Sequence, residues 1–119
     1  MDTFRVYAIL VLVIIQIGSC MADSCYGPPY VWGVECISST TVIGSPGRKV
    51  TFIVDVRRNG GISVCCKGYS PVDRNYHNLG CDSDGFRMTL DWGSYIDNPK
   101  IKCKADFLGV MVDWAVYGD

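Results

Sequence analysis

The cysteines constrain this chain more than any other feature of its sequence. It contains seven, and six of them follow residue 22: Cys25, Cys36, Cys65, Cys66, Cys81 and Cys103. An even number of cysteines in a short exported chain indicates a disulfide framework, here three bonds with fifteen possible connectivities. A zinc site is the weaker interpretation, because no Cys-x-x-Cys pair occurs and His77 is not spaced from a cysteine pair as a zinc ligand would be.

The N-terminal segment indicates the compartment. Residues 6–17 form an almost unbroken apolar run. This run is too short to cross a bilayer as a helix, which takes about 20 apolar residues. An apolar run followed by small residues is typical of a secretory signal peptide. We expect cleavage after Ala22, which makes residues 1–22 a signal peptide and residues 23–119 a single disulfide-rich β domain that is secreted and extracellular.

Charge and hydropathy narrow the classes of partner. The chain has 11 basic and 12 acidic residues, so the average charge indicates neither nucleic acid nor an anionic membrane as a partner. No second long apolar run follows the leader, and we expect no membrane anchor. The alternative interpretation of the leader is a bacterial lipobox with Cys20 lipidated, which the single arginine before the apolar run disfavours.

Alternation of apolar and polar residues predicts strands rather than helices. The predicted strands are 30–37, 50–56, 62–66, 86–92, 101–103 and 108–116. Asn59-Gly60-Gly61 is typical of a hairpin turn between the second and third of these. Residues 67–84 are polar and predict an irregular loop. The pattern predicts an all-β fold, a small antiparallel β-barrel or sandwich stapled by three disulfides.

Strand geometry favours one disulfide pairing. Neighbouring residues on a strand point to opposite faces, so Cys65 and Cys66 cannot enter the same layer. Pairing of strand 30–37 with strand 50–56, followed by the hairpin, would bring Cys36 near Cys65. A bond from Cys66 would close the polar loop, and the remaining bond would tie the two ends of the domain. The expected pairs are Cys66–Cys81, Cys36–Cys65 and Cys25–Cys103.

Few residues have catalytic potential. His77 is the single histidine and Glu35 the single glutamate. We expect His77 in a solvated loop with no carboxylate or nucleophile fixed beside it, although a small secreted ribonuclease using both residues is the enzymatic hypothesis. The segment 82–85 lacks the further ligands of a calcium loop and instead predicts a turn that enters the strand at Phe86. We therefore expect no enzyme, no catalytic or metal site and no cofactor.

The tryptophans predict where the core lies. Trp32, Trp92 and Trp114 all fall on apolar strand faces, which predicts that they form the core. The alternative is a barrel with a gap lined by these rings, which would hold a small apolar ligand.

Several motifs also match a known family in order and spacing. They are Ser24-Cys25 with Tyr30-Val31-Trp32, Asn59-Gly60-Gly61, Cys66, Cys81 and Asp82-Ser83-Asp84-Gly85-Phe86. In these the chain resembles the Alternaria major-allergen family of small secreted fungal proteins, over most of residues 24–92 and more loosely at Cys103. The chain departs from that family in its shorter segment between Trp92 and Cys103 and in having Cys36 and Cys65.

The resemblance implies a function. It implies a compact β-barrel without catalytic residues, acting as a secreted, non-enzymatic effector or allergen-like protein of a plant-associated fungus. Its partner in the apoplast would be a host extracellular protein, such as a thaumatin-like defence protein, or a small apolar ligand. No ligand-binding residues carry over from the family. The alternative function is a secreted toxin or antimicrobial protein that acts on competing microbes or host cells.

Overall fold

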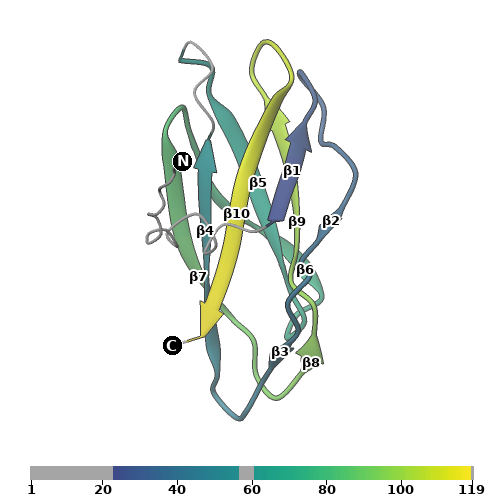
Figure 1. The fold of residues 1–119 in the computed structure, drawn as a ribbon. Helices are drawn as coiled ribbons and strands as arrows, with labels where there is room; N and C mark the ends of the chain where they lie inside the picture. Colours follow the sequence, from purple (N-terminus) through teal and green to yellow (C-terminus); the bar gives the residue numbers. More distant parts are fainter. Residues whose placement is uncertain (1–22, 57–60, 119) are drawn as a thin grey trace, which may run out of the picture.

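A computed structural model describes residues 23–56 and 61–118, and all the regular structure in these residues is β-strand. Figure 1 shows the strands as arrows. They are β1 (Asp23–Gly27), β2 (Cys36–Ile37), β3 (Val42–Ile43), β4 (Lys49–Val56), β5 (Val64–Ser70), β6 (Asn75–Asp82), β7 (Gly85–Asp91), β8 (Ile96–Asp97), β9 (Lys100–Ala105) and β10 (Val110–Gly118).

The strands form two four-stranded sheets and one two-stranded sheet. The first sheet has the order β1-β10-β4-β7, the second the order β2-β9-β5-β6, and the small one joins β3 to β8. Every pair of neighbouring strands is antiparallel. Each large sheet keeps two edge strands, so the sheets are not closed into a barrel. The prediction of an all-β, antiparallel, disulfide-stapled fold is confirmed, and of its two forms the barrel is wrong.

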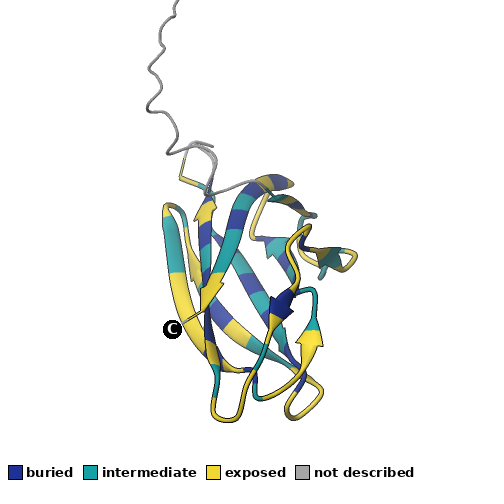
Figure 2. Ribbon diagram, turned by 60° about the horizontal axis from the view of Figure 1, so that its bottom comes forward, coloured by how far each residue is buried: buried dark blue, intermediate teal, exposed yellow. Residues whose placement is uncertain are grey.

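Alternating side chains on β4 and β10 build the core between the large sheets. Val50, Phe52 and Val54 are at most 2% exposed, whereas Lys49 and Asp55 on the same strand face solvent. The Phe52 ring stacks against Trp114 of β10, with centroids 6.4 Å apart and planes within 3°. Figure 2 shows this alternation as dark and light bands along the strands. Strands with one apolar face must bury it against a second layer, and the second sheet supplies that layer.

The predicted strand over residues 30–37 is wrong except for Cys36–Ile37. Tyr30 has a φ of 68°, which is left-handed backbone that a strand does not contain. Residues of both alternating sets face solvent: Tyr30 and Val34 of one set are 67% and 82% exposed, and Val31 of the other set is 60% exposed. None of residues 30–37 is buried, so the alternation of residue types there does not mark a side that faces the core.

The predicted hairpin at Asn59-Gly60-Gly61 is also wrong. The strand before it, β4, belongs to the first sheet, and the strand after it, β5, belongs to the second. Residues 57–60 lie outside the described residues, while Gly61 has a φ of 89°. The glycine-rich segment therefore connects the two sheets instead of two neighbouring strands.

The irregular loop predicted over residues 67–84 is largely a hairpin of β5 and β6. Its register pairs Tyr69 with Tyr76 and Gly68 with His77. These strands are polar because their outer side chains face solvent, and the inner position at Gly68 is filled from the opposite sheet. A Cβ atom placed there would lie 3.2 Å from the Phe52 ring. The turn predicted at residues 82–85 is confirmed, and it leads into β7.

The structure contains three disulfides, but none of the predicted pairs. The bonds are Cys25–Cys36, Cys65–Cys81 and Cys66–Cys103, with Cα–Cα distances of 5.7, 4.0 and 4.1 Å. The predicted Cys36–Cys65 bond assumed that β5 follows β4 in one sheet, the predicted Cys66–Cys81 bond assumed an irregular loop over residues 67–84, and Cys25–Cys103 was the pair that remained. Instead β5 lies between β6 and β9, so Cys65 bonds to its register partner on β6 and Cys66 to its register partner on β9.

Candidate binding face

A row of lysines follows the outer side of β9. Lys100, Lys102 and Lys104 are half-buried, whereas the alternate residues Ile101 and Cys103 are fully buried. Because a strand has a side-chain period of two, the three lysines must share the face that points away from the core. The sequence at residues 100–105 reads Lys-Ile-Lys-Cys-Lys-Ala and contains this signal.

The neighbouring strands add a cation and two rings to the same face. Lys67 of β5 is the register partner of Lys102, and directly opposed residues of an antiparallel pair lie on one face. Tyr69 of β5 opposes Tyr76 of β6, with ring centroids 5.4 Å apart and an edge-on angle of 65°.

Trp32 reaches the face from the connection between β1 and β2. The ammonium groups of Lys67 and Lys104 lie 4.3 and 4.9 Å from its ring centroid. The prediction that Trp32 is a core residue is therefore wrong, whereas Trp92 and Trp114 are buried as predicted. Trp32 belongs to an irregular segment between β1 and β2 that has no side facing the core, so its ring packs against lysines instead.

Every lysine of the row rests on an aromatic ring. Lys100 lies 4.8 Å from the Tyr69 centroid, and Lys102 lies 4.8 Å from the Tyr76 centroid. An ammonium over a ring face at an exposed site is stabilised by about 0.5–1 kcal/mol. We call this surface the lysine–aromatic face. Its members are Trp32, Lys67, Tyr69, Tyr76, Lys100, Lys102 and Lys104.

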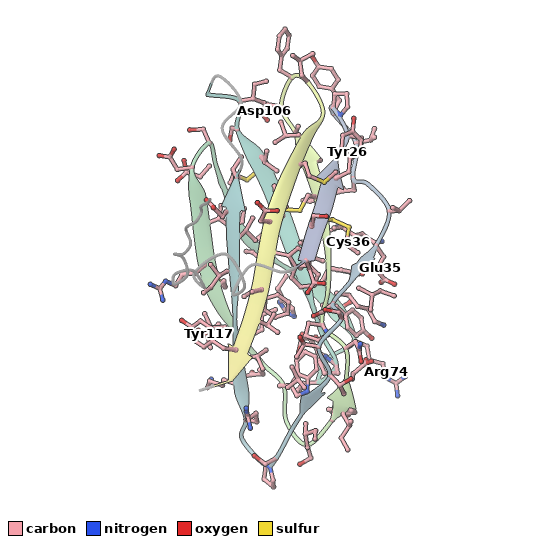
Figure 3. The ribbon with its side chains drawn as sticks, in the orientation of Figure 1. Tyr26, Glu35, Cys36, Arg74, Asp106 and Tyr117 are labelled. Atoms are coloured by element: carbon pink, nitrogen blue, oxygen red, sulfur yellow. A yellow bond between two sulfur atoms is a disulfide. The ribbon has the colours of Figure 1, made fainter. Side chains whose placement is uncertain are left out.

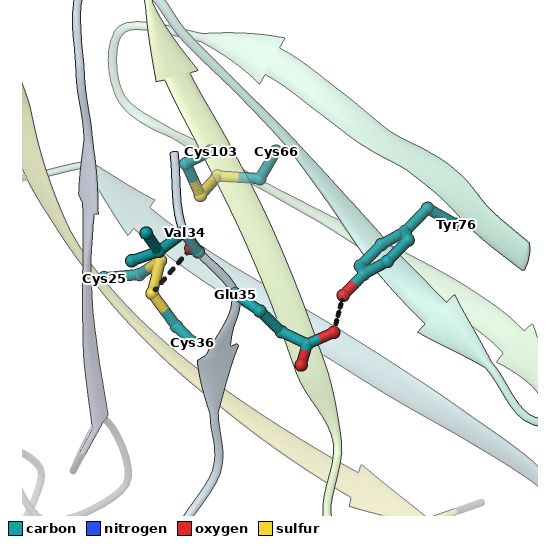
Figure 4. The surroundings of a disulfide bond; sticks show 7 residues. All are labelled: Cys25, Val34, Glu35, Cys36, Cys66, Tyr76 and Cys103. Carbon is teal, nitrogen blue, oxygen red and sulfur yellow. Dashed lines mark hydrogen bonds between the residues drawn. A yellow bond between two sulfur atoms is a disulfide. The ribbon is translucent and has the colours of Figure 1, made fainter. Parts of the chain in front are cut away.

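Glu35 brings one carboxylate to the margin of the face. Its Oε2 accepts a hydrogen bond from the Tyr76 hydroxyl, as Figure 4 shows. Burial, followed by the hydrogen bond from the hydroxyl to Glu35, raises the pKa of Tyr76 above its ordinary value of 10.0. Tyr76 is therefore a neutral phenol at physiological pH, and the ring faced by Lys67 and Lys102 carries no charge of its own.

In the part of the chain that the structure describes, the lysines of the face form no ion pair with a carboxylate. Four of the five lysines of the chain lie here, with one glutamate beside them. Within the described residues, the recorded ion pairs lie elsewhere, Lys49–Asp91 at 3.0 Å and His77–Asp73 at 2.7 Å. Ammonium groups on one surface repel one another, so the cluster concentrates positive potential on one side of a chain whose net charge is −1.

The structure places His77 differently from the prediction. It lies on β6 rather than in a loop, and its Nε2 is 2.7 Å from Asp73 Oδ2, so the expectation that no carboxylate is fixed beside it is wrong. The two line a shallow depression of about 250 Å³ together with Ser70. Ser70 Oγ donates to the Asp91 carbonyl, so His77 and Ser70 are engaged with different partners.

The residues of the enzymatic hypothesis are not brought together. Glu35 contacts Tyr76, whose neighbour His77 points to the opposite side of β6. Across residues 23–56 and 61–118 there is no group of three or more His, Cys, Asp or Glu side chains placed to hold a metal ion. In the same residues no helix is long and apolar enough to cross a membrane.

Comparison with protein-family models and with curated proteins gave no match. No protein-family model fits the sequence, and no curated protein is similar to it. The resemblance to the Alternaria major-allergen family therefore stays a prediction. The three disulfides are consistent with an extracellular location. The predicted signal peptide lies outside the described residues.

Proposed function

We propose that this protein is a secreted, non-enzymatic binding protein that recognises an acidic partner outside the cell through its lysine–aromatic face. The observation that carries the proposal is the set of four ammonium groups held on rings of one sheet face without a carboxylate ion-pair partner in the described residues. Fixed positive charge on one face steers an acidic partner toward it and fixes the orientation in which the partner binds.

The rest of the fold suits such a role. Three disulfides hold the sheets and the strand pairs together, and this stabilises a small domain in an oxidising, protease-rich compartment. A rigid sheet presents its side chains with little loss of freedom on binding. A host extracellular protein with an acidic surface is the partner that fits both this face and the function implied by the allergen resemblance.

Binding to simple polyanions tests the proposal. The oxidised protein is titrated with poly-glutamate, heparin and a neutral dextran at low and physiological salt. We expect at least one polyanion, and not dextran, to bind with an affinity that falls as salt screens the charges. Replacing all four lysines by Gln should weaken binding by at least about tenfold, since each lost surface pair is worth up to about 1 kcal/mol.

Replacing the same four lysines by Arg is the matched control. Arginine keeps the charge and also interacts with aromatic rings, so this variant should bind like the original protein. Equal binding by the glutamine variant, or no polyanion binding at any salt concentration, would overturn the proposal.

A toxin or antimicrobial role is the second candidate, and one surface feature favours it. Exposed apolar side chains gather at the end of the molecule where Figure 3 labels Tyr26 and Asp106. The group comprises Tyr26, Tyr30, Val31, Phe107, Leu108 and Met111, which lie on the paired ends of β1 and β10, in the β9–β10 connection, or in the segment after β1 that bonds to Ala105. Apolar tips of this kind insert into lipid or into an apolar pocket. Growth inhibition of microbes or host cells by the oxidised protein would support this role, and inactivity across a broad panel would remove it.

A further inference from the structure

The lysines of β9 form a row with a fixed spacing. Alternate residues of a strand are about 6.4–6.8 Å apart, so Lys100, Lys102 and Lys104 span roughly 13 Å in a straight line. Lys67 lies beside the middle of this row, as the register partner of Lys102. A ligand that meets all the lysines must carry anionic groups with the same repeat.

An extended polypeptide has this repeat. Carboxylates at every second residue of an extended segment also recur at about 6.4–6.8 Å and point to one side. Same-face side chains of an α-helix are about 5–6 Å apart and turn around the helix axis. The spacing of the row therefore favours an extended acidic segment over a helical one.

The rings hold the ammonium groups in place before a ligand arrives. Tyr69 lies under Lys100, Tyr76 under Lys102, and Trp32 beside Lys104. Side chains that are already ordered lose less entropy on binding. The same contacts place cations over the ring faces that nucleic-acid bases would stack on, which disfavours a single-stranded nucleic acid.

Glu35 shows that a carboxylate fits at this face. It belongs to an irregular segment and accepts a hydrogen bond from Tyr76, the ring on which Lys102 rests. A carboxylate of a bound segment has the same kinds of donor available, a phenol and ammonium groups. Glu35 also lowers the positive potential at that point, so it competes with an acidic ligand.

We propose that the lysine–aromatic face binds an extended acidic segment of a partner protein, laid along β9 with its carboxylates at every second residue. This inference rests on the proposed function and specifies the shape and charge pattern of the partner.

Two peptides of equal composition test the spacing. Acetylated Glu-Ser-Glu-Ser-Glu-Ser-Glu places every carboxylate in step with the row, whereas Glu-Glu-Glu-Glu-Ser-Ser-Ser places half of them on the far side. Fluorescence anisotropy at low salt should give the alternating peptide up to about fivefold tighter binding, because it can form one further surface charge pair with the three-lysine row, worth up to about 1 kcal/mol. Heparin and oligothymidylate are titrated in parallel.

Single variants test whether the preference for the alternating peptide depends on the lysine row of β9. Lys102→Gln should reduce the preference for the alternating peptide, whereas the matched control Lys49→Gln, on the opposite sheet, should leave it unchanged. Glu35→Gln should strengthen binding of the alternating peptide, a gain that misfolding cannot produce.

The outcomes separate this inference from the proposed function. Equal affinity for the two peptides, or tighter binding of heparin or oligothymidylate than of either peptide, would overturn the extended segment and leave an acidic partner standing. If no anion binds, both proposals are overturned. Preferential binding of the alternating peptide that depends on Lys102 supports the inference.

Discussion

Cys65 and Cys66 are neighbours in the sequence with different surroundings in the fold. Cys65 is half-buried on the outer side of β5, whereas Cys66 is fully buried in the core. The alternation of side chains along a strand predicts that the two cysteines point to opposite faces. It does not predict their disulfide partners, because the choice between β6 and β9 depends on which strands flank β5. The sequence separations of the bonds, 16 and 37 residues, carry no such information.

The exposed disulfide should be reduced before the buried one. Cys81 is exposed, whereas Cys66 and Cys103 are both 0% exposed, and thiol–disulfide exchange requires access to a sulfur atom. Limited reduction with a small thiol, followed by alkylation and peptide mapping, should label Cys65 and Cys81 first. Early labelling of Cys66 or Cys103 would contradict the assigned environments.

The His77–Asp73 contact should be visible in the titration of Asp73. The hydrogen bond from His77 lowers the pKa of the Asp73 carboxyl below its ordinary value of 3.8. A lowered carboxyl pKa stabilises the fold at pH values above 3.8, and this contribution is lost as the pH falls through the lowered value.

A carboxyl-detected NMR titration measures the effect directly. The Asp73 midpoint should lie below 3.8 and rise toward that value in His77→Gln. A midpoint at or above 3.8 in the original protein would mean that the contact does not form in solution.

At the scale of elements, alternation predicted strands best where a second layer covers one face. The buried apolar faces of β4 and β10 made those strands recognisable from the sequence, and the edge strand β7 was recognisable from its alternation although Leu90 is its only buried residue. Residues 30–37 alternate but have no layer over them, and most of them do not form a strand. Residues 67–82 lack an apolar face because Gly68 and Gly80 occupy positions filled by Phe52 and Phe86 from the other sheet. A glycine at such a position gives no hydrophobic signal.

The two faces of β9 should respond differently to substitution. Ile101→Ala removes a fully buried side chain and should lower the free energy of unfolding by about 2–5 kcal/mol. Lys102→Ala removes one contact with an exposed ring and should cost at most about 1 kcal/mol. Urea denaturation of both variants measures the difference. Equal losses would show that Ile101 does not face the core.

At the scale of the whole molecule, the net charge concealed how the charges are distributed. A balance of 11 basic and 12 acidic residues argued against anionic partners, yet four lysines share one face of the second sheet. The outer face of the first sheet is mixed, with Lys49 and Arg87 beside Asp55 and Asp91. An average over the sequence cannot distinguish a mixed surface from a segregated one.

Part of the candidate site was visible in the sequence and part was not. The Lys-Ile-Lys-Cys-Lys-Ala pattern of residues 100–105 places three lysines on one face of any strand. The contribution of Tyr76 and Glu35 depends on a contact between residues 41 positions apart. The place of Trp32 depends on an irregular segment that crosses toward β5 and β9. Contacts of this kind follow from topology rather than from local pattern.

The central claim is that the lysine–aromatic face is the surface that binds an acidic partner. Titration of isotope-labelled protein with the alternating glutamate–serine peptide, followed by amide and indole NMR signals, tests it most directly. We predict that the shifted signals will cluster at Trp32, Lys67, Tyr76 and Lys102, and that the buried indoles of Trp92 and Trp114 will not move. Shifts concentrated on the outer face of the first sheet or at the apolar end around Phe107, with the Trp32 indole unmoved, would contradict it.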